Sequence, residues 1–266
     1  MNSAGVKIHL NDVSKYFYTR FGTVKALEKV NCTVKAGEFF VIIGPGGCGK
    51  TTLLRIMAGL ESRSAGEILV SRETPHQPLT AMVFQENSIF PWMTVEANIG
   101  YGMKNRGAPA GERERVVKAY IEKVGLTTFA RAYPHELSGG MKQRVSVARA
   151  FAANPEVLLM DEPFGSLDEQ TRAVLQEELL RIWEETRKTV IFITHSIDEA
   201  VLMGDRILVM SAHPGRVKSI VDVPFSRPRR VYEIRKEPGY GELVFDLWNQ
   251  LQADIRQGAP QPQEIL

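Results

Sequence analysis

Short hydrophobic runs alternate along the chain with longer segments in which hydrophobic residues recur every three or four positions. The runs FFVIIG at 39–44, VLLMDEP at 157–163 and TVIFITH at 189–195 contain the nearly continuous apolar stretches that are typical of strands buried on both faces of a parallel sheet. Helical spacing predicts one helix that ends at Gly125 and another over about 168–187. Strands that alternate with helices in this way predict an α/β fold.

The pattern differs in the first part of the chain and in the region that follows it. Residues 6–43 contain strand-like segments with a hairpin turn expected at Gly37, and two short strands are expected within 66–85. Helical patterns dominate residues 90–150, and the segments DRILVM and RVKSIVDV predict a closing pair of strands. We therefore expect an α/β core with an antiparallel β subdomain and an inserted helical subdomain.

The composition is that of an ordinary globular protein. The 266 residues are 44% hydrophobic, and 33 basic against 31 acidic residues give a net charge of +2. This balance provides no overall field that would attract nucleic acid or an anionic membrane. Cys32 and Cys48 lack metal-binding spacing and are expected to be reduced thiols.

Neither a secretory nor a membrane-spanning segment is predicted. The N-terminal stretch MNSAGVKIHLNDVSKYF lacks the apolar core of a signal peptide. No stretch reaches the ~18 consecutive apolar residues of a membrane helix. Any role at a membrane is therefore expected to depend on a partner.

The segment GPGGCGKTT at 44–52 fits the phosphate-loop pattern G-x-x-x-x-G-K-[ST]. It follows a predicted strand and opens a helix expected from about Lys50 to Leu60, which is the context that such a loop requires. Lys50 would place a cation against the β- and γ-phosphates, and Thr51 would offer a hydroxyl to Mg²⁺. Cys48 is expected to be a small filler, where a bulky thiol reagent would block nucleotide binding. The predicted nucleotide-binding residues of the loop are Gly44, Pro45, Gly46, Gly47, Cys48, Gly49, Lys50, Thr51 and Thr52.

Two adjacent carboxylates end the apolar strand VLLMDEP. Buried strands rarely end in paired acids for packing reasons, because unpaired buried charge is costly. Asp161 suits Mg²⁺, directly or through water, and Glu162, which would point to the other face of the strand, suits the activation of a water molecule. The alternative is a pair of solvated carboxylates at a strand end.

Gln85 and His195 each close a predicted strand, after AMVF and IFIT respectively. Open α/β sheets bind ligands at the carboxyl ends of their strands, so both side chains are candidates for the same site. Gln85 would bind Mg²⁺ or water through its amide, and His195 would act beside the substrate. On spacing alone, each is equally consistent with an ordinary structural residue.

The segment LSGGMKQRVSVAR at 137–149 begins a basic, amphipathic helix. Ser138 is a favoured residue immediately before a helix, while Gly139 and Gly140 allow the backbone to approach a ligand closely. The segment therefore predicts a helix N-terminus whose free N–H groups form an anion site.

Several motifs occur in a fixed order, namely GPGGCGKTT, Gln85, LSGGMKQR, LLMDEP, SLD at 166–168 and THS at 194–196. Together they resemble the ATP-binding subunit of an ABC transporter over nearly the whole chain, and LSGG distinguishes this family from other phosphate-loop NTPases. The resemblance implies an ABC ATPase cassette, which is a phosphate-loop NTPase core with an antiparallel β subdomain and a helical subdomain. It also implies ATP as the substrate and Mg²⁺ as the cofactor. One such domain is expected over 1–237, followed by a short helical extension and tail over 238–266.

The resemblance also assigns roles across a dimer. Two copies would pair head to tail, so that Ser138, Gly139 and Gly140 of one copy contact the γ-phosphate of ATP bound by the other. Asp168 would link the two sites, and His195 would contact the γ-phosphate.

Two positions depart from the family pattern. Gly46 stands where the family often has Ser, and Met141 stands where many members have Gln.

The resemblance also implies an aromatic residue that stacks on adenine. Phe17 matches this position, with Tyr16 as a second candidate, and the alternative is that Phe17 is an ordinary strand aromatic.

The apolar cluster Phe90–Met93 is expected in a loop and predicts a docking site for the membrane subunits, unless Trp92 packs under the helical subdomain. The phrase IFPWMTV resembles the nitrate/sulfonate/taurine/bicarbonate group of importers. The basic stretch SRPRR at 226–230 is consistent with a nucleic-acid or lipid patch, but a packed tail is favoured.

Together, these features predict the ATP-hydrolysing subunit of an ABC importer for a small solute, with an anion such as nitrate, a sulfonate, taurine or bicarbonate as the expected solute. The expected partners are a second ATP-binding subunit, two transmembrane permease subunits and, indirectly, a solute-binding protein, with no nucleic acid. The expected location is peripheral, on the cytoplasmic face of the cell membrane. The alternatives are a soluble ABC ATPase outside transport and the ATPase subunit of an exporter.

Overall fold

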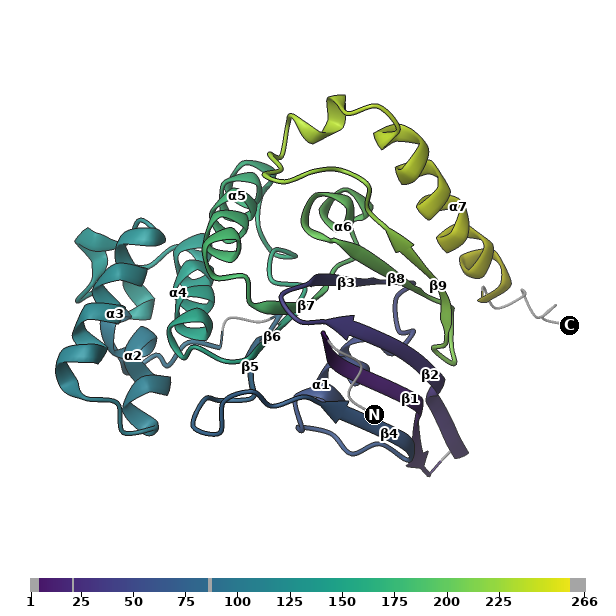
Figure 1. The fold of residues 1–266 in the computed structure, drawn as a ribbon, viewed down its shortest axis with the longest axis horizontal. Coiled ribbons are helices and arrows are strands. Elements are labelled where there is room, and N and C mark those ends of the chain that lie inside the picture. The colour runs from purple at the N-terminus through teal and green to yellow at the C-terminus, as the bar shows by residue number, and fades with distance from the viewer. Residues whose placement is uncertain (1–4, 21, 86–87, 259–266) are drawn as a thin grey trace, which may run out of the picture.

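The computed structural model describes residues 5–20, 22–85 and 88–258, with the backbone alone described from residue 253. Two β-sheets and the helices around them make up this part of the chain (Figure 1). Within the predicted extension and tail at 238–266, residues 259–266 lie outside the described residues.

The smaller sheet of the described chain is antiparallel, in the strand order β2-β1-β4. Its strands are β1 (Val6–Thr19), β2 (Gly22–Lys35) and β4 (Ala65–Val70). Thr19 pairs with Gly22, so the hairpin of this sheet joins β1 to β2. The hairpin predicted at Gly37 is wrong, because Gly37, with a φ of 73°, leads from β2 into a strand of the other sheet.

The larger sheet has the strand order β5-β6-β7-β3-β8-β9 in the described chain. Neighbouring strands are parallel except for β8 and β9, which form the predicted closing antiparallel pair. Every residue of the three central strands β6, β7 and β3 is buried, as their continuous apolar sequences predict. The strands are β5 (Thr80–Val83), β6 (Val157–Asp161), β7 (Thr189–Ile193), β3 (Phe39–Ile43), β8 (Arg206–Met210) and β9 (Val217–Asp222).

Helices cover both faces of the larger sheet (Figure 1). On one face, α1 (Lys50–Met57) shares a hydrophobic core with β1 and β2. On the other face, a second core contains α4 (Gly139–Ala152), α5 (Glu169–Thr186) and α6 (Ile197–Met203). The larger sheet therefore lies between two hydrophobic cores, and the predicted α/β architecture is confirmed.

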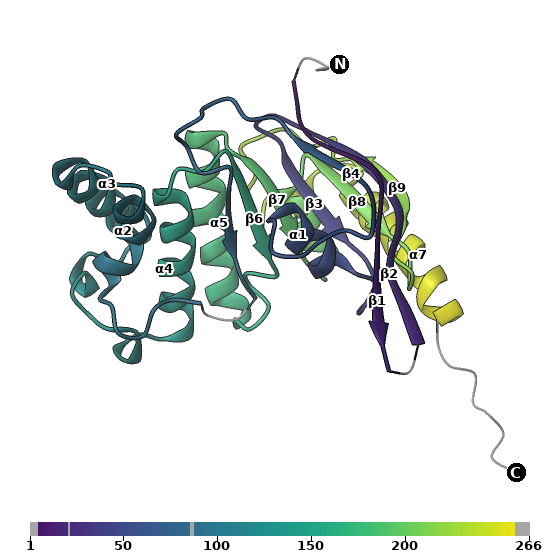
Figure 2. The ribbon, with the colours of Figure 1, turned by 90° about the horizontal axis from the view of Figure 1, so that it is seen from below.

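The predicted helical region forms a lobe beside α4. It contains α2 (Val95–Asn105) and α3 (Ala110–Lys123), and both views place these two helices on the far side of α4 from the larger sheet (Figures 1 and 2). Short 3₁₀ turns at Thr127–Phe129 and Pro134–Glu136 lead from this lobe into α4.

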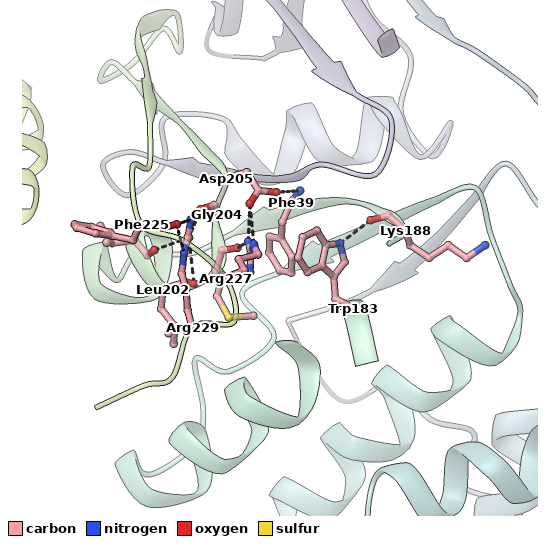
Figure 3. A network of polar contacts seen from close by, with 11 residues as sticks. Phe39, Trp183, Lys188, Leu202, Gly204, Asp205, Phe225, Arg227 and Arg229 are labelled. Carbon is pink, nitrogen blue, oxygen red and sulfur yellow. Dashed lines mark hydrogen bonds and ion pairs between the residues drawn. The ribbon is translucent and has the colours of Figure 1, made fainter. Parts of the chain in front are cut away.

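The basic stretch at 226–230 packs against the core instead of forming an open patch. Arg229 is buried, and its guanidinium donates to the carbonyl oxygens of Phe225, Val201 and Gly204, two of them at the end of α6 (Figure 3). Arg227 donates to Asp205 at 2.8 Å and lies 4.1 Å from the ring centroid of Trp183. The packed-tail interpretation is therefore confirmed for these two arginines.

The chain ends in a 3₁₀ turn at Ile234–Lys236 and helix α7 (Tyr240–Gly258). Leu247 of α7 is fully buried, whereas Phe245 and Trp248 are exposed. Within the described residues, no helix combines the length and apolar character that a bilayer crossing requires.

Candidate functional site

The predicted phosphate loop runs from the end of β3 to the start of α1. Gly47 and Gly49 have φ values of 73° and 98°, which other residues adopt only with strain. A Cβ on Gly49 would lie 2.8 Å from the carbonyl oxygen of Ala26 in β2, so the loop is packed tightly against the smaller sheet. A Cβ on Gly46 would meet no atom within 4 Å, which shows that the loop leaves room for the serine common in the family.

Lys50 and Cys48 lie inside this loop. The buried ammonium of Lys50 donates to the carbonyl oxygens of Gly44 at 2.8 Å and Pro45 at 3.0 Å, so the cation lies over the loop where phosphate oxygens would be held. Cys48 is fully buried, as expected for a filler, and burial raises the pKa of its thiol. A buried thiol of raised pKa reacts poorly, so the expected attack by a bulky thiol reagent is not supported.

Thr51 and Asp161 come together at the carboxyl end of β6. The Thr51 hydroxyl donates to Asp161 Oδ1 at 3.1 Å, and Asp161 is buried. Burial raises the pKa of Asp161, and the hydrogen bond from Thr51 opposes this shift. A hydroxyl and a carboxylate oxygen at one point are the hard ligands that Mg²⁺ takes together with phosphate oxygens and water, so these residues fit a magnesium ion.

Glu162 connects Gln85 and His195. Gln85 Nε2 donates to Glu162 Oε2 at 3.1 Å, and His195 Nε2 lies 2.5 Å from Glu162 Oε1. Three residues from three strand ends thus converge, as their positions predicted. The expectation that Glu162 continues the alternation of the strand is wrong, since β6 ends at Asp161 and Glu162 has a φ of 45°. A non-glycine residue in this left-handed region is strained, and such strain is concentrated at functional sites.

The LSGG segment forms the N-terminus of α4, as predicted. The Ser138 hydroxyl caps the helix by accepting from the N–H of Met141 at 3.3 Å. A Cβ on Gly140 would lie 2.7 Å from Thr171 in α5, whereas one on Gly139 would meet no atom within 4 Å. Strand β6 lies between α4 and α1 in both views (Figures 1 and 2), so α4 and the phosphate-loop helix are separate in this chain.

Asp168 begins a helix and Phe17 lies on the smaller sheet, and the roles proposed for both stay predictions. Asp168 caps α5 by accepting from the N–H of Thr171 at 3.0 Å. Phe17 is partly exposed on β1. Two positions before it, Lys15 pairs across the strands with Leu27 of β2, and Leu27 lies against Gly49 of the phosphate loop. Phe17 therefore lies on the central strand of the smaller sheet, near the part of that sheet that adjoins the phosphate loop.

The apolar cluster after Gln85 reaches the surface. Trp92 is 69% exposed, so the alternative in which it packs under the helical subdomain is wrong. Phe90 is partly buried, with its ring centroid 4.5 Å from that of Tyr101 and 5.6 Å from that of Trp92. This leaves the Trp92 ring exposed on a fixed base.

Two residues that the sequence analysis missed hold this cluster in place. Asn98 in α2 is fully buried, and its amide bonds to the backbone of Phe90, Met93 and Thr94 at 2.7–3.1 Å. Arg149 in α4 donates to the carbonyl and hydroxyl oxygens of Ser88, both at 2.9 Å. Ser88 lies 61 positions before Arg149, so no local pattern marks that contact. Asn98 was missed although its backbone partners lie within eight positions of it.

Comparisons with known proteins identify the family of the chain. A family model described as ABC transporter matches residues 27–165. The chain is 46% identical over 224 residues to the aliphatic sulfonates import ATP-binding protein SsuB of Bacillus anthracis, covering 84% of this chain and 88% of that protein. It is 47% identical over 226 residues to an ABC transporter ATP-binding protein of Methanocaldococcus jannaschii, covering 84% of this chain and 85% of that protein.

A solved structure shows the same fold. The chain resembles a dimeric ATP-binding cassette in a post-hydrolysis state bound to ADP and Pi, with a TM-score of 0.72 and 29% identity over 82% of this chain and all of that one. The chain therefore belongs to the ABC transporter family, and its fold is that of an ABC ATPase cassette. It is the ATP-binding subunit of a transporter, an enzyme that hydrolyses ATP with Mg²⁺.

Proposed function

We propose that this subunit powers the import of a small anionic solute of the sulfonate, nitrate, taurine or bicarbonate class. The observation that carries its catalytic part is the Glu162 carboxylate held between Gln85 and His195 beside the phosphate loop. The direction and the solute class are supported by similarity to a subunit named for aliphatic sulfonate import. The protein would act at the cytoplasmic face of the membrane through its partners.

Each residue of the site has a distinct task in hydrolysis. Lys50 and the N–H groups of residues 44–52 would hold the phosphates, and Phe17 would stack on adenine. Thr51 and Asp161 would hold Mg²⁺, with Gln85 close to them. The bound ion would neutralise charge on the β- and γ-phosphates.

Glu162 is the proposed general base. Its two carboxylate oxygens face Gln85 and His195, and each oxygen keeps a second lone pair that can accept from the attacking water. We infer that His195 leaves Glu162 and donates to the γ-phosphate, where negative charge needs a donor.

A second copy of the chain would complete the site. Ser138, Gly139 and Gly140 start a helix that is separate from the phosphate loop of its own chain, so their N–H groups are available to ATP held by another. A helix N-terminus attracts the γ-phosphate, and hydrolysis removes that attraction. Asp168, at the start of α5 near Gly140, would link the two sites.

The permease subunits would dock beside Trp92. A groove of about 710 Å³ lies between α2 and α3, and Met93 forms part of its wall. Its apolar lining includes Met93, Tyr101, Val117 and Ile121. A short amphipathic helix of a membrane subunit would fit such a groove, with Trp92 at its edge as an aromatic anchor.

Replacing Trp92 by Ala is expected to weaken assembly with the membrane subunits without affecting the isolated protein. Because Trp92 is exposed, the free energy of unfolding should change by less than about 0.5 kcal/mol, and the basal ATPase rate should remain. Assembly is measured by the yield of membrane subunits that co-purify with the tagged chain. Trp248→Ala, which removes a 47% exposed tryptophan on α7, is the matched control and should retain full assembly. Equal losses in both variants would refute docking at Trp92.

The solute is tested with the complete transporter in proteoliposomes. The subunit, its membrane partners and the solute-binding protein are combined, and ATP hydrolysis is measured with an alkanesulfonate, taurine, nitrate or bicarbonate. We expect one of these anions to raise the hydrolysis rate and to move toward the ATPase side of the membrane. Stimulation by none of them would reject the solute class, and movement away from that side would reject import.

A further inference from the structure

A buried carboxylate outside the ATP site lies beneath the turn that carries His195. Glu199, in α6, is only 7% exposed. Its Oε2 accepts a short hydrogen bond from the hydroxyl of Thr194, and the same hydroxyl accepts from the N–H of Ser196 at 3.0 Å. Thr194 and Ser196 flank His195, so Glu199 holds the backbone on both sides of the histidine.

The other oxygen of this carboxylate faces α5. Gln176 Nε2 donates to Glu199 Oε1 at 3.0 Å, and Arg172 Nε lies 3.8 Å from the same oxygen. Arg172 also donates from Nη2 to the carbonyl oxygen of Leu167 at 2.8 Å. Since Leu167 immediately precedes Asp168, one arginine joins the Asp168 loop to the carboxylate beneath the His195 turn.

These contacts connect helices that lie on the same face of the larger sheet (Figure 1). Burial raises the pKa of Glu199, which means that retaining a carboxylate here opposes folding. An apolar side chain would avoid this penalty, so stability alone is a weak reason for an ionisable group at this position. A stronger reason for a carboxylate here is that it bonds to the turn around His195 and lies close to the arginine that binds the loop before Asp168.

We propose that Glu199 and Arg172 are positioning residues for ATP hydrolysis, which tie the Thr194–Ser196 turn to Leu167 so that His195 and Asp168 keep one relative arrangement. The inference rests on the roles proposed above for His195 and Asp168. The side-chain hydrogen bonds of Glu199 and Arg172 go to Thr194, Gln176 and Leu167, so among the described residues the pair acts through these neighbours and not through the phosphate loop.

The test compares kcat with the KM for ATP in the full chain. Glu199→Ala and Arg172→Met should each lower kcat at least about tenfold, because small displacements of catalytic groups have large effects on rate. The KM for ATP should stay within about threefold of the unchanged protein, since residues 44–52 are untouched. Because both residues serve one link, the double variant should lose no more than the worse single variant.

Glu156→Ala is the matched control. Glu156 is also 7% exposed, pairs with Lys7 at 2.6 Å and accepts from the N–H groups of Glu73 and Thr74. It precedes β6, at the end of the strand opposite Asp161. Burial would raise the pKa of Glu156, but Lys7 and the two backbone amides outweigh this effect and lower the pKa to about 2. This control should lower the melting temperature and leave kcat per folded molecule unchanged.

The outcomes separate this inference from the proposed function. If kcat of both Glu199→Ala and Arg172→Met matches that of Glu156→Ala, or if the two losses multiply in the double variant, the link is refuted while the ATP site stands. If the unchanged protein fails to hydrolyse ATP, the proposed function itself fails. Arg172 is partly exposed, so Arg172→Met keeps the test decisive even if Glu199→Ala does not fold.

Discussion

Replacing Glu162 by Gln is expected to reduce ATP turnover at least about 100-fold and to trap the protein as an ATP-bound dimer. The amide keeps the size of the side chain and one acceptor oxygen for Gln85, but it cannot take a proton from water. The γ-phosphate would therefore remain in place, and the attraction between it and the α4 N-terminus of a second copy would persist. Phosphate release measures the turnover, and light scattering with ATP and Mg²⁺ measures the assembly.

Glu114→Gln is the control for this result, because it makes the same chemical change on the exposed surface of α3. It should hydrolyse ATP at the original rate and should not accumulate as a dimer. If Glu162→Gln remains monomeric with ATP and Mg²⁺, the head-to-tail sandwich is wrong. If it hydrolyses ATP at the rate of Glu114→Gln, another group is the base.

The parts of the site that could be predicted from sequence are those fixed by neighbouring residues. The phosphate loop depends on glycines, Lys50 and Thr51 within nine positions, so the order of residues determines its shape. Asp161 and His195 were placed at one edge because each ends an apolar strand, and parallel strands end at a common edge. The structure brings Glu162 to within contact of Gln85 and His195, as this reasoning requires.

Other features depend on residues that only tertiary structure brings together. The turn at Gly37 has the local character of a hairpin, but β3 pairs with β7 and β8, which lie more than 140 positions later in the chain. The left-handed conformation of Glu162 likewise cannot be inferred from a run of apolar residues that ends in two acids. Glu199 resembles an ordinary acid in the first turn of a helix, and its role emerges only when α5 supplies Gln176 and Arg172.

The exposure of Trp92 could not be predicted from the sequence either, because an aromatic residue beside a proline is equally compatible with a buried loop and with an exposed docking loop. What fixes the loop is Asn98, which is buried and binds the backbone on both sides of Trp92, while the Trp92 ring is 69% exposed. A buried amide with several backbone partners thus fixes the loop that presents this apolar side chain at the surface.

Replacing Lys50 by Ala is expected to weaken ATP binding at least about 30-fold, which corresponds to about 2 kcal/mol for lost hydrogen bonds to a charged group. The buried ammonium bonds to the carbonyl oxygens of Gly44 and Pro45, and phosphate oxygens would replace these neutral acceptors with charged ones. Titration calorimetry measures the affinity, and circular dichroism checks that the variant is folded. Lys118→Ala removes an exposed lysine from α3 and should bind ATP normally. Undiminished binding by folded Lys50→Ala would show that the loop at 44–52 is not the phosphate site.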